Sequence, residues 1–194
     1  FLVAFYVNKS FMLIVLSYFI LSNIYSYFLK SFAILDLVLL SSFYLIRILS
    51  GGIATETIIS FWLLIFSFLI FFSLASVKRL SEINYLSSKS IDLKGRGYVN
   101  SDLPLITGIS LSSGYLSILV LALYINSETS VALYKSPQLL LLCCCILFYW
   151  ISRLIFLGHR NKINMDPILF ALKDKVSWLC LLLMGLVVLV SLKF

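Results

Sequence analysis

Six apolar segments, each close to 20 residues long, dominate this sequence of 194 residues. They are approximately Ser10–Leu29, Phe32–Leu49, Ile58–Val77, Leu103–Ile125, Pro137–Leu157 and Val176–Leu192. A helix needs roughly 20 mostly apolar residues to cross the hydrocarbon layer of a membrane. Charged residues make up only 12% of the chain, which excludes both a soluble globular domain and a disordered chain. The sequence therefore predicts an all-α polytopic membrane helix bundle with about six transmembrane helices, forming one domain over residues 1–194.

The basic residues divide unequally between the two sides of these spans. The poorer side holds four of the 15 Lys and Arg residues, among them Arg47, which we interpret as a snorkelling or structural arginine. The positive-inside rule assigns the richer side to the cytoplasm. That side holds Lys30, Lys78, Arg79, Lys89, Lys94, Arg96, Arg153, Arg160, Lys162, Lys173 and Lys175.

The connections between spans differ in length and polarity. Lys78–Asp102 and Gly158–Lys175 are long and polar, and long polar loops often carry functional groups. The connections Gly51–Thr57 and Asn126–Ser136, on the other side, are interpreted as plain turns. Gly51 and Gly52 are expected to end the second span, and Asp102 is expected to cap the fourth.

Two features at the predicted cytoplasmic boundary carry groups capable of chemistry. Asp36 is an acid just inside a span, where an ionised carboxylate is costly without a partner; a local pair with Lys30 or a capping role is the simpler alternative. Lys78 and Arg79 precede Glu82 by four and three residues, so that one helical face can present two cations and an acid. Such a face suits a phosphate with its metal, or else it is a basic anchor with an intrahelical salt bridge.

Two further segments lie in the long connections. Lys94–Tyr98 places glycines on both sides of an arginine, which favours either phosphate wrapping or a solvated turn. Asp166 followed by Pro167 predicts an N-cap with proline at the first helical position. His159 is interpreted as an ordinary interfacial histidine, although a proton carrier is an alternative. Hydrolytic triad and zinc motifs are absent from the sequence.

These segments, in this order, resemble the UbiA superfamily of intramembrane prenyltransferases. The resemblance rests on YSYFLK with the following Asp36, then RILSGG, KRLSE, GRGY and GHR with DPILFALKD, and it covers about residues 25–178. The nearest branch is that of the polyprenyl-phosphate phosphoribosyltransferases and their relatives. The resemblance implies a nine-helix bundle around a lipid-accessible cavity, and Mg²⁺ held against a diphosphate by two polar motifs.

The resemblance also implies roles for individual residues. The Tyr and Lys element of the family maps onto Tyr25 and Lys30, with a spacing of five rather than four. The second polar motif maps onto Lys78, Arg79 and Glu82, with one acid and two cations in place of two aspartates. This departure favours phosphoribosyl transfer to a polyprenyl phosphate over aromatic prenylation. The expected catalytic residues are Lys30, Asp36, Lys78, Arg79 and Glu82, the expected Mg²⁺ ligands Glu82 and Asp36, and the expected substrate-binding residues Tyr25, Arg96, Tyr98, Arg160, Asp166 and Lys173.

The first acidic motif of the family is missing from the sequence. The six spans correspond to the last six of nine, so we expect the chain to be the C-terminal two-thirds of a bundle and to be inactive alone. The expected partners are a polyprenyl lipid, a soluble phosphate-bearing or aromatic co-substrate and membrane lipids, but no nucleic acid. The expected location is the bacterial inner membrane. The alternatives are an aromatic prenyltransferase and a non-catalytic bundle, either a transporter portion or a scaffold that binds anionic lipid.

Overall fold

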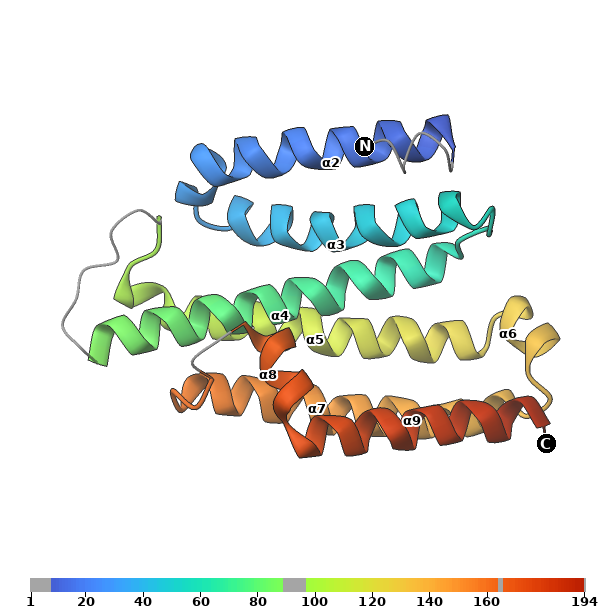
Figure 1. The fold of residues 1–194 in the computed structure, drawn as a ribbon. Helices are drawn as coiled ribbons and strands as arrows, with labels where there is room; N and C mark the ends of the chain where they lie inside the picture. Colours follow the sequence, from blue (N-terminus) through green and yellow to red (C-terminus); the bar gives the residue numbers. More distant parts are fainter. Residues whose placement is uncertain (1–7, 89–96, 164–165, 194) are drawn as a thin grey trace.

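A computed structural model describes residues 8–88, 97–163 and 166–193, and these residues form helices joined by turns, with no strand among them. Figure 1 shows the long helices running side by side as one bundle. The α-helices are α2 (Lys9–Tyr27), α3 (Leu35–Ala54), α4 (Phe61–Ser88), α5 (Leu103–Ile125), α6 (Glu128–Leu133), α7 (Leu141–His159), α8 (Pro167–Lys173) and α9 (Lys175–Lys193). Short 3-10 turns are η1 (Leu29–Ser31), η2 (Asn100–Asp102) and η3 (Pro137–Leu140).

Six of these helical segments are long and apolar enough to cross a membrane, which confirms the six predicted spans. Helix α4 is the longest, with 28 residues. At 1.5 Å per residue it measures about 42 Å, against about 30 Å for the hydrocarbon layer. Its last turns therefore extend beyond the layer, at the end of the bundle where α2 ends and α3 and α5 begin. Because Lys30, Lys78 and Arg79 lie there, we call it the basic end.

The α4–α5 pair forms the most extensive contact in the bundle. Small residues let the two backbones approach closely, as is usual between membrane helices. A Cβ atom on Gly114 would lie 2.9 Å from the Ser73 hydroxyl and 2.7 Å from Ile151. The Ser73 hydroxyl donates a hydrogen bond to the Ser110 carbonyl at 2.7 Å, and the Ser110 hydroxyl donates to the Ser73 carbonyl at 3.3 Å. These contacts fix α4, which carries the polar residues of the basic end.

Two local predictions at the opposite end are wrong. Gly51 and Gly52 do not end the second span, because α3 continues to Ala54 and Thr55 is its C-cap. The lack of a side chain at Gly52 instead makes room for the following turn, since a Cβ atom there would lie 2.4 Å from the Ile59 side chain. The connection 126–136 is not a plain turn, because it contains helix α6, which Ser127 caps through its side chain.

Candidate functional site

The basic end contains a buried cluster centred on Arg79, which is only 2% exposed. Asp36, in the first turn of α3, is fully buried and receives two hydrogen bonds from Arg79, one from Nε to Oδ2 and one of 2.8 Å from Nη2 to Oδ1. Arg79 Nη1 donates to Glu82 at 2.5 Å, one turn further along α4. The Tyr25 hydroxyl donates to Asp36 Oδ1 at 2.6 Å. We call Tyr25, Asp36, Arg79 and Glu82 the Arg79 cluster.

The Arg79 cluster joins three helices, α2, α3 and α4. A bidentate pair between arginine and carboxylate is the strongest common form of ion pair. Both oxygens of Asp36 are occupied by Arg79, and one also by Tyr25. The described residues contain no group of three or more His, Cys, Asp or Glu side chains that could hold a metal ion. In this structure Asp36 is therefore the ion-pair partner of Arg79. The assignment of Asp36 as a Mg²⁺ ligand stays a prediction.

Tyr98 attaches the connection before α5 to the turn before α3. Its hydroxyl accepts a hydrogen bond of 3.0 Å from the Ile34 amide, and Ile34 adopts a left-handed φ of 66° that a β-branched residue rarely takes. Gly97 permits the approach, because a Cβ atom there would lie 2.4 Å from the Ser31 carbonyl oxygen. Burial raises the pKa of Tyr98 to about 12, so the phenol is protonated at neutral pH. Tyr98 thus lies beside the Arg79 cluster.

Lys78 precedes Arg79 in the sequence but points to a different neighbour. Its ammonium donates to Asp166 Oδ2 at 2.7 Å, and the two side chains are 29% and 27% exposed. Asp166 is also the N-cap of α8, since its Oδ1 accepts from the Ile168 amide at 3.1 Å. Pro167 begins the helix, which confirms the predicted cap. Lys78 therefore connects α4 to the start of α8.

A second ion pair fixes the other end of α8. Asp174 accepts hydrogen bonds of 2.6 and 3.0 Å from Arg153 on α7, and two more from Ser177 at the start of α9. Burial raises the pKa of Asp174, but these hydrogen bonds outweigh burial and hold its pKa below the ordinary value. The Trp178 indole donates to the Leu172 carbonyl at 2.8 Å. Helix α8 is thus tied at both ends, across the front of the bundle between α4 and α9 (Figure 1).

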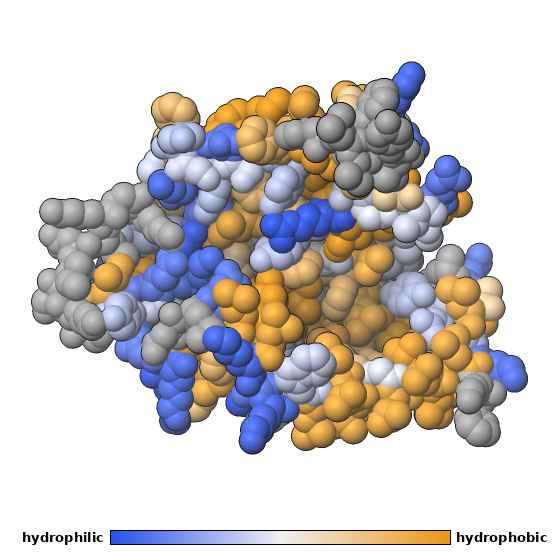
Figure 2. Space-filling model, viewed as in Figure 1, coloured by the Kyte–Doolittle hydropathy of each residue, from blue (hydrophilic) through white to orange (hydrophobic). Residues whose placement is uncertain are grey.

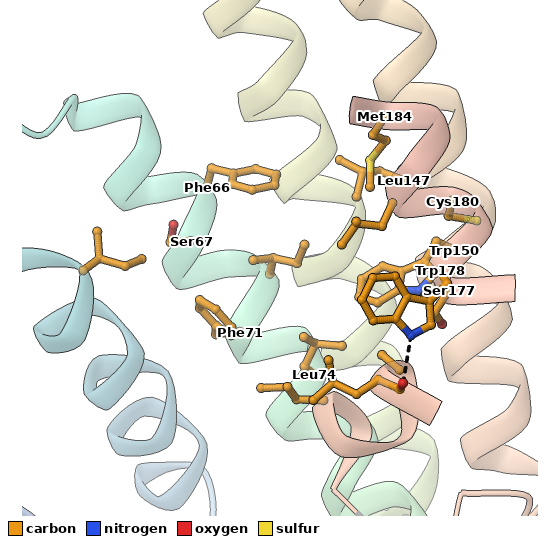
Figure 3. A pocket seen from close by; sticks show the side chains of 16 residues that line it. Phe66, Ser67, Phe71, Leu74, Leu147, Trp150, Ser177, Trp178, Cys180 and Met184 are labelled. Atoms are coloured by element: carbon orange, nitrogen blue, oxygen red, sulfur yellow. Dashed lines mark hydrogen bonds between the residues drawn. The ribbon is translucent and has the colours of Figure 1, made fainter. Parts of the chain in front are cut away.

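An apolar cavity of about 540 Å³ lies between α4, α7 and α9, with α8 at one end of it. Figure 2 shows it as a hollow lined by hydrophobic side chains, with hydrophilic side chains gathered mostly at the basic end. In Figure 3, Phe66 and Phe71 of α4 face Leu147 and Trp150 of α7 across the hollow, and Trp178 donates its hydrogen bond at the rim. A small neighbouring space of about 20 Å³ is lined by Tyr44, Lys78 and Asp166, and it shares Phe71, Leu74 and Ile168 with the large cavity. The Lys78–Asp166 pair therefore lies next to the cavity, beyond these shared side chains.

The structure brings together some predicted site residues and separates others. Tyr25, Asp36, Arg79 and Glu82 form one cluster, and Lys78 and Asp166 form a pair beside it. The remaining candidates do not join them. Lys30 and Lys173 are exposed without a hydrogen-bond or ion-pair partner among the described residues, and Arg160 lies 4.0 Å over the Phe156 ring. Arg96 lies outside the described residues.

The sequence predictions missed the Arg153–Asp174 pair and the role of Arg47. The spacing Asp174-Lys-Val-Ser177 is an N-cap pattern that could have indicated the bonds of Asp174 to Ser177, but not its ion pair with Arg153. Arg47 donates from Nη2 to the Tyr18 hydroxyl at 2.6 Å and lies over the Tyr18 and Tyr44 rings. The i, i+3 spacing of Tyr44 and Arg47 could have indicated one of these contacts.

Comparison with known proteins finds relatives that match most of this chain. No protein-family model matches the chain. The chain is 37% identical over 168 residues to nodulation protein NoeC of Azorhizobium caulinodans, a match that covers 86% of this chain and 54% of NoeC. It is 35% identical over 173 residues to a Sinorhizobium fredii protein named uncharacterized protein y4nM, covering 88% of this chain and 34% of that protein. The chain thus spans about half and about a third of the length of these relatives.

Proposed function

We propose that this protein is a UbiA-like integral membrane transferase that acts on a polyprenyl phosphate at the basic end of the bundle. The supporting observation is the apolar cavity of about 540 Å³, which lies next to the Lys78–Asp166 pair. Apolar cavities with a few convergent polar groups are the usual form of ligand sites. A prenyl chain would occupy the cavity. Its phosphate would replace the Asp166 carboxylate as the partner of the Lys78 ammonium.

The proposed reaction is transfer of a phosphoribosyl group from a soluble diphosphate donor. A lipid phosphate oxygen forms the new bond to the anomeric carbon, and the bond from that carbon to the diphosphate breaks, with the electron pair leaving on the diphosphate. Lys78 holds the attacking phosphate. Glu82, whose side chain is 31% exposed and pairs with Arg79 at 2.5 Å, would contact the ribose of the donor. The proposal also places the basic end in the cytoplasm of a bacterial cell, where soluble phosphate donors occur.

Magnesium is part of the proposal, but the described acids do not make a site for it. Asp36 is fully buried against Arg79, and Glu82 also pairs with Arg79. Mg²⁺ commonly reaches proteins bound to substrate phosphates and held by only one or two carboxylates. We therefore propose that the ion arrives bound to the diphosphate donor.

A transfer assay on the complete protein in membranes tests the proposal. Phosphoribosyl diphosphate with polyprenyl phosphate is compared with an allylic diphosphate and an aromatic acceptor, each with Mg²⁺. We expect product only from the first pair, and we expect Lys78→Ala and Glu82→Gln to abolish it while the protein remains folded. Lys162→Ala removes an exposed charge at the same end and should not change the rate. Normal turnover in both site variants, or product only from the second pair, contradicts the proposal.

A non-catalytic bundle that binds anionic lipid is the second candidate. The observation that favours it is the closed state of the Arg79 cluster, in which Arg79 and Asp36 are buried against each other rather than open to a substrate. A purely structural cluster would look the same. Absence of turnover with both substrate pairs, together with retained binding of polyprenyl phosphate, would favour this candidate.

A further inference from the structure

Arg47 is a charged residue inside α3, one of the six helices long and apolar enough to cross a membrane. It lies twelve residues after the start of α3 at Leu35 and seven before its end at Ala54. At 1.5 Å per residue these separations are about 18 Å and about 10 Å along the helix axis. The side chain is exposed on the bundle surface. A charged side chain at this depth is costly and commonly marks a functional site.

The direction of the side chain shows that Arg47 does not snorkel. A snorkelling arginine extends toward the nearer membrane surface, which for Arg47 is the end of α3 at Ala54. Its guanidinium instead lies 5.2 Å from the centre of the Tyr44 ring, one turn back along the helix, and 5.4 Å from the Tyr18 ring. Its Nη2 donates to the Tyr18 hydroxyl at 2.6 Å. Two tyrosines from α2 and α3 therefore hold the charge inside the span.

Arg47 also differs from other cations of the long helices. Lys78 pairs with Asp166, Arg79 with Asp36, and Arg153 with Asp174. Arg47 has no carboxylate partner among the described residues. An arginine has five N–H donors in a planar fork, and a tyrosine hydroxyl that accepts a hydrogen bond still has its own proton to donate. The Arg47 guanidinium and the Tyr18 hydroxyl thus offer several donors on one surface.

This donor group lies beside the apolar cavity. Ile48, the next residue, lines the cavity, and Tyr44 stacks at 4.1 Å on Phe71, which lines it from α4. Figure 2 shows a hydrophilic patch over the α2–α3 pair, next to the apolar hollow. A free inorganic anion is strongly disfavoured at this depth, whereas an amphiphile brings its anionic group with its apolar chain.

We propose that Arg47, with Tyr18 and Tyr44, binds the phosphate of a membrane lipid whose apolar chain lies against the cavity. The guanidinium makes two parallel hydrogen bonds to phosphate oxygens, as arginine does with phosphates elsewhere. The Tyr18 hydroxyl donates a further hydrogen bond, and the Tyr44 ring covers the cation. The phosphate is either the diester of an anionic phospholipid or the monoester of a polyprenyl phosphate. The site does not depend on the proposed transfer reaction.

Lipid binding to the purified full chain tests this site. The protein in a neutral detergent is titrated separately with phosphatidylcholine, phosphatidylglycerol and polyprenyl phosphate, and bound lipid is counted by native mass spectrometry. Arg47→Gln removes the charge at similar length, Arg47→Lys keeps the charge without the planar fork, and Tyr18→Phe removes only the hydroxyl. Lys9→Gln is the matched control, because Lys9 is an exposed cation at the start of α2. Circular dichroism confirms that each variant is folded.

We expect phosphatidylglycerol or polyprenyl phosphate to bind more tightly than phosphatidylcholine. Arg47→Gln should weaken that binding about tenfold, Tyr18→Phe about threefold and Arg47→Lys by an intermediate amount, because hydrogen bonds to a charged group are lost. Lys9→Gln should leave it unchanged. If Arg47→Gln loses binding of both phosphatidylglycerol and polyprenyl phosphate, the site binds lipid phosphates in general. If it loses binding of one of them, that lipid is the ligand. Equal affinity of wild type for all three lipids, or unchanged binding in Arg47→Gln, overturns the proposal.

Discussion

Lys78 and Arg79 are adjacent in the sequence but belong to two different polar regions. Arg79 turns toward α2 and α3, where it is 2% exposed and bound to Asp36, Glu82 and Tyr25. Lys78 turns toward α8, where it forms one ion pair and remains 29% exposed. Side chains at successive helical positions point about 100° apart, so neighbours in the sequence often reach different surroundings.

The two ion pairs differ in whether a ligand can reach their charges. A buried and fully hydrogen-bonded pair resists exchange with a ligand, because removal of one partner leaves an uncompensated charge. A half-exposed pair can exchange its carboxylate for a phosphate at little cost. The buried Arg79–Asp36 pair, with Tyr25, is therefore suited to hold three helices together, and the Lys78–Asp166 pair to meet an anionic substrate.

The largest effect is expected from Asp36→Asn, which removes the buried partner of Arg79. We expect the variant to lose about 3–5 kcal/mol of stability, the usual effect of breaking a buried ion pair. The measurement is thermal or denaturant unfolding in detergent, compared with wild type. The double variant Asp36→Leu with Arg79→Met should lose less than the single variant, because no buried charge remains. A loss below about 1 kcal/mol for Asp36→Asn would show that the cluster is open to water, and the two regions would then not differ.

The parts of this structure that sequence could predict are those set by local patterns. Hydropathy predicted the six spans, and Asp166 with Pro167 predicted the start of α8. The i, i+3 spacing of Arg79 and Glu82 predicted their ion pair. The prediction that Gly51 and Gly52 end the second span was wrong, because glycine also occurs where another segment packs closely against a helix.

Contacts between distant segments could not be predicted in the same way. Asp36 and Arg79 are 43 residues apart, and Lys78 and Asp166 are 88 apart. Both pairs depend on which faces of α3, α4 and α8 meet, and packing decides that. The alternatives proposed for Asp36 named Lys30 as its local partner, whereas the structure gives it Arg79 and Tyr25.

A smaller effect on stability is expected at Asp174. This residue fixes the C-terminal end of α8, whose start carries the Lys78–Asp166 pair. Asp174→Asn should lose about 2 kcal/mol, because the hydrogen bonds of a charged acceptor to Arg153 and Ser177 weaken. The lowered pKa of Asp174 also gives the pair a pH dependence. Its stabilisation is complete above the ordinary pKa of an aspartate and is lost as the pH falls through the lowered pKa of the folded state.

Unfolding measured from neutral to acidic pH tests the Asp174 prediction. The difference in stability between wild type and Asp174→Asn should shrink as the pH falls. Asp102→Asn is the control, since Asp102 accepts from the Val99 amide in a turn away from α8. A constant difference across this pH range would mean that the charge of Asp174 does not contribute.

The smallest effect on stability is expected from Lys78→Gln. Ion pairs of this exposure contribute about 0–1 kcal/mol, so the unfolding midpoint should stay close to that of wild type. The start of α8 should nevertheless become more mobile, because Asp166 keeps only its cap bond to Ile168. Spin labels at Leu169 on α8 and Leu63 at the start of α4, both exposed, would report a broader distribution of the distance between α8 and α4. A loss of stability as large as that of Asp36→Asn would show that Lys78 is as important to the fold as Arg79. An unchanged distance distribution would show that α8 is held by its packing against α4 and α9 alone.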